Sequence, residues 1–242
     1  MIAEFILLIA GAYILGAVPA SQVAAKLYKG IDLKKFGTGN IGVSNLARAT
    51  STWVAVPVII FDFGKGMAPV YLAKQLGMGP YQQVVMGLAS IVGHNWPIFL
   101  NFSGGRGVLT SLGVGLVLEP RLAAIATAIA LAFVLFRETA LGVLVATAAL
   151  PVISLILSSP LTVDAKIAVT LGFLFIFLLI VFRRLTAPLS PLATTTKIKR
   201  RELLLNRFLF DRDIRSRSTW VKSSSPPDLV SQMSDEEDKT IK

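Results

Sequence analysis

Long apolar runs recur along most of this 242-residue chain, and they restrict its fold more than any other feature of the sequence. A helix needs about 20 consecutive apolar residues to cross the hydrocarbon core of a bilayer. Hydrophobic residues make up 54% of the chain and charged residues only 16%, a balance that excludes an ordinary soluble domain. The runs do not alternate as the strands of a membrane barrel would. We therefore predict an all-α, polytopic membrane protein.

Seven apolar segments are candidate transmembrane helices, and two of them are short for a full crossing. The segments are Ile2 to Ala25, Thr52 to Leu76, Gln82 to Leu100, Val108 to Leu118, Leu122 to Phe136, Leu141 to Leu157 and Ile167 to Phe182. The first segment carries Glu4 where a cleavable signal peptide would carry positive charge, so we expect it to remain as a mature helix.

Basic residues gather in alternate connections between these segments. Basic residues near span ends stay preferentially in the cytoplasm. The sparse side holds only Lys74, Arg121 and Lys166, and we predict that it is external, with the N-terminus outside and the C-terminus in the cytoplasm. The predicted cytoplasmic side holds Lys26, Lys29, Lys34, Lys35, Arg48, Arg106, Arg137, Arg183 and Arg184.

Two glycine-rich polar segments interrupt the apolar pattern, both on the predicted cytoplasmic side. One runs from Gly37 to Asn45 with Arg48 just beyond it, and the other runs from Gly93 to Gly107. Flexible loops of this kind bind anions when their backbone N–H groups and neighbouring cations converge. We interpret the two segments as a phosphate site where the bilayer meets water.

The first segment matches the pattern G-x-G-x-x-G, which elsewhere marks a dinucleotide-binding turn between a strand and a helix. Here it follows an apolar helix and a basic stretch, which argues against that assignment. Its glycines allow close approach of a ligand, its polar side chains add hydrogen bonds, and its arginine adds a bidentate cation. An ordinary glycine-rich connector is the alternative. The candidate residues are Gly37, Thr38, Gly39, Asn40, Gly42, Ser44, Asn45 and Arg48.

The second segment places a glycine-rich turn directly before the helix predicted from Val108. Anions are favoured at a helix N-terminus by its unpaired N–H groups and its dipole. The spacing of a Walker lysine is absent, so no nucleoside triphosphate is implied. His94 is either structural or part of the site. The candidate binding residues are Ser103, Gly104, Gly105, Arg106 and Gly107.

Asp62 and Lys65 lie three residues apart within the second predicted span, and so on one helical face. An ion pair inside a membrane must face protein or water. Two interpretations stay open: the pair anchors this helix beneath the loops, or Lys65 adds positive potential to the phosphate site.

Metal-dependent and covalent chemistry find little support in the composition. The chain has no cysteine and a single histidine, which excludes thiolates and argues against zinc. Ser44, His94 and Asp62 could be assembled into a triad, but no nucleophile elbow accompanies them. We expect neither metal nor cofactor. The economical reaction is direct transfer between two bound substrates, in which positioning and charge stabilisation supply most of the rate.

The composition changes after residue 186, which ends the predicted transmembrane domain. Residues 187–222 form a basic cytoplasmic tail in which leucines and phenylalanines alternate with arginines. This tail is either a short amphipathic helix on anionic lipid or a solvated extension. The excess of basic residues on the cytoplasmic side of membrane proteins already explains the basicity of this tail, so no nucleic acid is implied. Residues 223–242 are rich in serine, proline and acidic groups, and we expect them to be disordered.

The motifs resemble those of the bacterial membrane acyltransferases that transfer a fatty acyl group from acyl phosphate to glycerol 3-phosphate, the PlsY type. The resemblance extends to about residue 185 and excludes the tail. It rests on Gly16-Ala17-Val18-Pro19, Phe36 to Arg48, Asp62 to Gly66 and Gly93 to Thr110.

This resemblance implies a seven-helix enzyme of the cell (inner) membrane, with its site facing the cytoplasm, that performs the first acylation of phospholipid synthesis. The product would be lysophosphatidate. The implied partners are acyl phosphate, glycerol 3-phosphate, membrane lipids and the enzyme that makes acyl phosphate. The essential serine and arginine of the family's first motif correspond to Thr38 and Arg48. The two lysines of the second motif correspond to Ser103 and Arg106.

The chain departs from the family in the third motif. A His-Arg-Glu-Asn stretch, an Arg-Leu pair and a glutamate are expected after the last span, and only Arg184 and Leu185 match. The departure leaves a second hypothesis: a non-catalytic paralogue that binds or transports a phosphorylated lipid precursor.

The first hypothesis is the acyltransferase itself. In this hypothesis Arg48 and Arg106 neutralise the charge of the phosphate groups, and Thr38, His94 or a substrate phosphate is the base that accepts the hydroxyl proton.

Overall fold

The computed structural model describes residues 2–157, 162–190, 193–194, 198–216 and 220. Within these ranges the regular elements are helical, which confirms the predicted all-α class. They are α1 (Ile2–Ala17), α2 (Ala20–Lys29), α3 (Val43–Ala49), α4 (Thr52–Gln75), α5 (Pro80–Asn95), the short 3₁₀ helix η1 (Ile98–Leu100), α6 (Val108–Leu118), α7 (Pro120–Ala132), α8 (Thr139–Leu157), α9 (Val163–Leu185) and α11 (Arg200–Phe210). The expected disordered stretch, 223–242, lies outside the described residues.

Four helical stretches in the described residues are long and apolar enough to cross a membrane: Ile2–Lys29, α4, α8 and α9. Two further apolar helices, α6 and α7, are shorter. The first predicted span is not one regular helix, because α1 ends at Ala17 and α2 begins at Ala20. Pro19 lies between them, and proline lacks the N–H group that would continue the helical hydrogen bonds.

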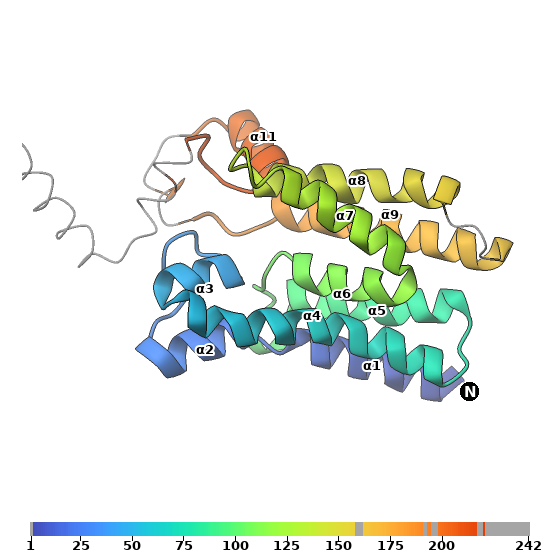
Figure 1. Ribbon diagram of the computed structural model, residues 1–242. Helices are drawn as coiled ribbons and strands as arrows, with labels where there is room; N and C mark the ends of the chain where they lie inside the picture. Colours follow the sequence, from blue (N-terminus) through green and yellow to red (C-terminus); the bar gives the residue numbers. More distant parts are fainter. Residues whose placement is uncertain (1, 158–161, 191–192, 195–197, 217–219, 221–242) are drawn as a thin grey trace, which may run out of the picture.

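The helices form two layers (Figure 1). α1, α4, α5 and α6 make one layer, and α7, α8 and α9 make the other, with contacts from α5 and α6 to α9 joining them. α2, α3 and α11 gather at one end of the molecule, and the N-terminus lies at the opposite end. Both glycine-rich segments therefore meet the C-terminal part of the described chain at the same end.

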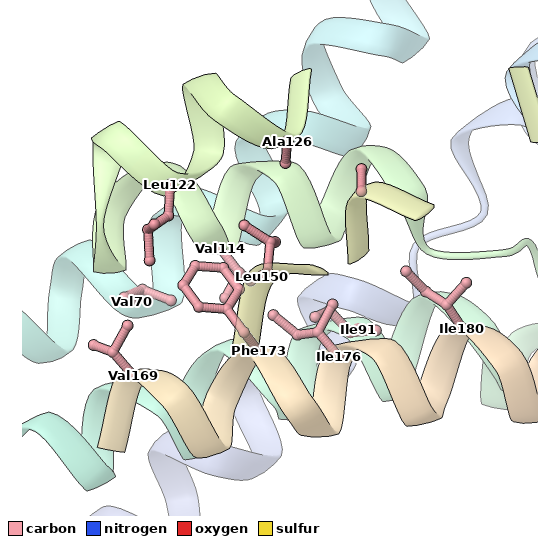
Figure 2. Packing of buried hydrophobic residues seen from close by; sticks show 11 residues of the cluster. Val70, Ile91, Val114, Leu122, Ala126, Leu150, Val169, Phe173, Ile176 and Ile180 are labelled. Carbon is pink, nitrogen blue, oxygen red and sulfur yellow. The ribbon is translucent and has the colours of Figure 1, made fainter. Parts of the chain in front are cut away.

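The contact between the layers is made by branched and aromatic side chains. Phe173 and Ile176 project from α9 toward Val114 of α6 and Leu150 of α8 (Figure 2). These four side chains are buried, with exposed fractions of 4% or less. Burying such a side chain contributes about 1.5–3 kcal/mol in a soluble protein. In a bilayer close packing replaces much of that driving force.

Glycines let two pairs of helices approach to backbone contact. A Cβ atom at Gly66 of α4 would overlap the backbone of α6, and one at Gly113 of α6 would overlap the backbone of α4. Gly16 of α1 and Gly93 of α5 form the same reciprocal arrangement. Small residues serve this purpose at helix interfaces in membranes, where lipid competes with apolar side chains.

α11 packs against α8 and α9, a placement that neither interpretation of the tail predicted. Arg207 of α11 is buried and donates hydrogen bonds to the carbonyl oxygens of Leu185, Ala187 and Pro188. Its Nε atom lies 2.6 Å from Oδ1 of Asp213. Arg207 therefore satisfies the last carbonyl group of α9, which has no helical partner, and two carbonyl groups of the segment that follows it.

Candidate functional site

A cavity of about 420 Å³ opens at the end of the molecule where the glycine-rich segments meet α11. Its wall combines polar groups from residues 38–48, the end of α5, the start of α6, the connection between α7 and α8, the end of α9 and the residues after α11. The lining includes Thr38, Asn40, Ser44, Arg48, Asp62, His94, Arg106, Gly107, Arg137, Glu138, Arg184, Asp211 and Arg212.

The first glycine-rich segment is held in shape by a single amide. Asn45, which is fully buried, donates hydrogen bonds to the carbonyl oxygens of Leu33, Phe36 and Asn40 at 3.0–3.3 Å. Its own oxygen accepts a hydrogen bond from the backbone N–H of Thr38 at 3.4 Å. Asn45 was predicted to bind substrate, but all of these bonds are internal to the loop, so its observed role is to fold the segment.

Within this loop, Gly37 and Gly39 adopt φ values of 57° and 69°, which side-chain-bearing residues rarely adopt. Neither glycine lines the cavity. Their turns carry Thr38 between them to the cavity wall, where its hydroxyl accepts a hydrogen bond from the N–H of Asn40 at 3.3 Å. The two glycines thus position Thr38 and need not touch a ligand themselves.

The second glycine-rich segment is folded against the end of α5. The N–H groups of Gly104 and Gly105 donate to the carbonyl oxygens of Asn95 and His94 at 3.2 Å. Arg183 of α9 then donates to the carbonyl oxygens of the same two glycines at 2.8 and 3.0 Å. The expectation that these two N–H groups bind phosphate is therefore corrected, because they are already paired within the protein.

The part of this segment that lines the cavity is the start of α6 and the two residues before it. Arg106, Gly107, Val108 and Leu109 line the cavity, and the first N–H groups of a helix have no partner within it. Gly107 has a φ of 70° and turns the chain into α6. The helix N-terminus predicted at the site is therefore present. It lies about one turn further along the chain than Gly104 and Gly105, which were expected to bind phosphate.

Arg106 reaches the cavity between two partners. Its Nε atom lies 2.7 Å from Oδ1 of Asp211, and Nη1 donates to the carbonyl oxygen of Arg183 at 3.4 Å. Arg48 also lines the cavity, from the last turn of α3. Two guanidinium groups predicted from the sequence are therefore part of one cavity wall.

Asp62 and Lys65 form a buried ion pair of 2.7 Å. Lys65 also donates to the carbonyl oxygen of Val18, between α1 and α2, at 3.2 Å. It lines a small neighbouring void and not the main cavity, so the anchoring interpretation accounts for its contacts. His94 Nδ1 lies 3.8 Å from Oδ1 of Asp62, beyond hydrogen-bond distance. This geometry does not support the triad.

The structure brings together about half of the predicted site residues. Those that line the main cavity are Thr38, Asn40, Gly42, Ser44, Arg48, His94, Arg106 and Gly107. Those that do not are Gly37, Gly39, Asn45, Lys65, Ser103, Gly104 and Gly105. Ser103 is directed elsewhere, with its hydroxyl donating to the carbonyl oxygen of Asn101 at 3.4 Å.

Sequence reasoning gave no site role to the cavity residues that come from distant parts of the chain. Arg184, matched above only to the third motif of the family, donates to the carbonyl oxygens of Ala140 and Phe208 at 2.8 and 3.0 Å, and so joins α9 to α8 and α11. Arg212 forms an ion pair of 2.9 Å with Glu138. The available signal was a run of charged residues directly after a leucine-rich stretch, which is also typical of a solvated tail.

A second, apolar cavity of about 130 Å³ lies between α6, α7, α8 and α9. Ala126, Ala146 and Leu150 contribute to its wall, and Phe173 lies beside them. Val108 and Val143 line both cavities, so the apolar cavity adjoins the polar one. A ligand with a polar head group and an attached hydrocarbon chain would fit with its head group in the polar cavity and its chain in the apolar cavity.

The comparisons with known proteins agree with this geometry. A family model described as "Glycerol-3-phosphate acyltransferase" matches residues 6–188. A relative named glycerol-3-phosphate acyltransferase 5, from Dehalococcoides mccartyi, is 42% identical over 223 residues, which cover 92% of this chain and 95% of that protein. A glycerol-3-phosphate acyltransferase from Trichlorobacter lovleyi is 44% identical over 147 residues, covering 60% of this chain and 75% of that protein.

Solved structures of an integral membrane glycerol 3-phosphate acyltransferase, PlsY (YgiH), share the fold. The glycerol 3-phosphate form aligns with a TM-score of 0.71 at 31% identity, covering 90% of this chain and 98% of that chain. The lysophosphatidic acid form aligns with a TM-score of 0.66 at 32% identity, covering 75% of this chain and 88% of that chain.

Fold and site together define a helical membrane protein with a cationic cavity at one end. The chain belongs to the glycerol-3-phosphate acyltransferase family. The family model ends at residue 188, whereas matches to 92% and 90% of this chain continue past it. The likeness therefore extends into the part of the chain that contains α11.

Proposed function

We propose that this acyltransferase moves an acyl group from acyl phosphate to the 1-hydroxyl of glycerol 3-phosphate, releasing lysophosphatidate and inorganic phosphate. Family membership supports acylation of glycerol 3-phosphate. The observation that carries the proposal for this chain is the cavity in which Arg48, Arg106 and the first turn of α6 share one wall. Guanidinium groups and helix N-termini are the groups that bind phosphate.

The reaction we propose is a direct displacement. The hydroxyl oxygen of glycerol 3-phosphate attacks the acyl carbon, the bond from that carbon to the phosphate oxygen breaks, and the hydroxyl proton passes to a base. Thr38, His94 or a substrate phosphate oxygen is the acceptor. Arg48 and Arg106 stabilise charge on the phosphates. Holding two substrates in register supplies much of the rate without a covalent enzyme intermediate.

We assign the acyl chain to the apolar cavity. Its wall is almost wholly hydrocarbon, and it meets the polar cavity at Val108 and Val143. If the acyl carbonyl of the acyl phosphate lies near these two valines, its phosphate group points toward Arg106 and its acyl chain toward α8. An apolar cavity with a few polar groups at its mouth suits such a ligand.

For the topology we propose seven crossings of the bacterial inner membrane, with the N-terminus outside and the cavity facing the cytoplasm. The arginines of the cavity and the lysines of α2 lie at the end opposite the N-terminus, in accord with the positive-inside rule. Membrane lipids surround the helices. An enzyme that makes acyl phosphate would deliver its product to this cytoplasmic end.

The deciding experiment uses detergent-purified protein, palmitoyl phosphate and glycerol 3-phosphate, and it follows both lysophosphatidate and phosphate. The wild type should form both products in equal amounts, and Arg48→Ala should lose on the order of 100-fold in rate. Lys35→Ala removes an exposed cation from the same loop and should leave the rate unchanged. Folded wild type that binds glycerol 3-phosphate without turnover would contradict the proposal and favour the non-catalytic paralogue.

A further inference from the structure

Asp211 places a negative charge inside a cavity built for anions. The residue caps the C-terminus of α11 with a φ of 51°, and its backbone N–H donates to the carbonyl oxygen of Arg207. Its carboxylate lies 2.7 Å from Nε of Arg106. The two side chains retain exposed fractions of 18% and 15%, and both line the cavity. A phosphate that approaches Arg106 must therefore meet Asp211.

Two buried arginines lie beside this ion pair: Arg106 donates to the carbonyl oxygen of Arg183, and Arg184 lines the same cavity. Arg183 and Arg184 are 3% and 1% exposed, and the hydrogen bonds found for their side chains in the described part of the chain go to backbone carbonyl oxygens. Of these three guanidinium groups, that of Arg106 forms the ion pair with Asp211. Two other acids of the described residues line the cavity and are already paired, Glu138 with Arg212 and Asp62 with Lys65.

A cluster of buried cations is unfavourable unless a counter-ion lies near it. When no phosphate is bound, Asp211 supplies that counter-ion. Once a phosphate dianion occupies the cavity, the same carboxylate becomes a like charge beside it and disfavours binding. One residue therefore stabilises the empty site and opposes the filled one.

We propose that Asp211 is an internal counter-ion that holds Arg106 when no substrate is bound and is displaced from it by substrate phosphate. This inference rests on the proposed function, because it concerns the phosphate subsite of that reaction. Binding then exchanges one anion for another at Arg106. The exchange lowers the affinity for glycerol 3-phosphate, and it also favours departure of the phosphate released by acyl transfer.

Asp211→Asn tests the exchange with little steric change, because asparagine also tolerates positive φ and has a similar size. Equilibrium binding of inorganic phosphate and of glycerol 3-phosphate should tighten by on the order of tenfold, at fixed ionic strength. Thermal unfolding without an anion should occur at a lower temperature than in the wild type. Added phosphate should then raise the unfolding temperature more than it does in the wild type.

Two controls separate this mechanism from a merely structural role. Glu202→Gln removes an exposed negative charge from the same helix and should leave phosphate affinity unchanged. In an Arg106→Gln background, Asp211→Asn should no longer tighten binding, since the proposed exchange acts through that guanidinium. If the asparagine variant does not fold, Asp211→Ser carries the same expectation.

Weaker or unchanged phosphate binding in the Asp211 variants would overturn the counter-ion proposal, and so would tightening that persists in the Arg106→Gln background. Because binding is measured without turnover, the result is independent of the reaction. If the Asp211 variants bind phosphate more tightly, in a way that depends on Arg106, while the wild type forms no lysophosphatidate, the counter-ion proposal is supported and the proposed function is refuted. Turnover by the wild type without this binding pattern would do the reverse.

Discussion

Single polar side chains shape both glycine-rich segments by donating to backbone carbonyl groups. Asn45 does this within residues 33–40, and Arg183 does it for Gly104 and Gly105. Loops of this length expose many backbone groups, and each buried one that lacks a partner costs about 1–3 kcal/mol. The loops are therefore ordered by a few donors outside the glycines themselves.

Asn45 is the sharper test of this role. Asn45→Ala should lower the free energy of unfolding by about 1–3 kcal/mol, because it leaves carbonyl groups without a donor. Asn45→Asp should be worse, since a carboxylate would replace that donor with a second acceptor. Thermal unfolding in detergent measures both variants. If Asn45→Ala and Asn45→Asp were equally stable, the assignment of Asn45 as the donor that orders this loop would be contradicted. Lys35→Ala serves as the surface control in the same loop.

At the residue level the sequence predicted which cations line the cavity better than the role of each glycine. Arg48 and Arg106 do line one cavity, whereas Gly104 and Gly105 fit the chain against the end of α5. A glycine needed for close packing and one needed for ligand approach look the same in a sequence. The contact of Arg183 with these glycines joins residues 78 and 79 positions apart, which no local pattern reveals.

At the scale of helices, apolar length was the reliable signal. The segments predicted at Thr52 to Leu76 and Leu141 to Leu157 agree closely with α4 (Thr52–Gln75) and α8 (Thr139–Leu157). The placement of α11 was missed because its stretch is short and its buried contacts come from asparagine and arginine. Buried polar residues do not stand out in a hydropathy pattern, so the sequence suggested a surface helix or a solvated tail.

The reciprocal glycines of α4 and α6 give a prediction at this scale. Gly113→Ala should destabilise the protein by about 1–3 kcal/mol, because the new methyl group overlaps the backbone of α4. Gly64→Ala is the matched control on α4, since nothing lies within 4 Å of its Cβ position. That variant should be neutral or gain about 0.5–1 kcal/mol from helix propensity. Unfolding in detergent separates the two, and equal effects would refute the close contact.

For the whole molecule, the adjoining cavities connect the phosphate chemistry to the selection of the acyl chain. Ala146→Leu fills part of the apolar cavity, so turnover with palmitoyl phosphate should fall relative to a shorter acyl phosphate by on the order of tenfold. Ala148→Leu adds the same volume on the exposed face of α8 and should leave the ratio unchanged. A parallel loss with both acyl phosphates would place the chain elsewhere.

The C-terminal part of the described chain completes the cavity, and its removal is a test of the whole assembly. A chain that ends at residue 199 keeps the helices from α1 to α9 but loses three contacts. Arg207 bonds to the end of α9, Asp211 pairs with Arg106, and Arg212 pairs with Glu138. Its turnover should fall by roughly 100-fold or more, because small displacements of positioning groups cost that much. A chain that ends at residue 220 keeps these residues and is the matched control. Since α4, α8 and α9 are long enough to span without α11, circular dichroism should still show a helical membrane protein. Wild-type turnover by the shorter chain would show that the polar groups of the first nine helices suffice for catalysis.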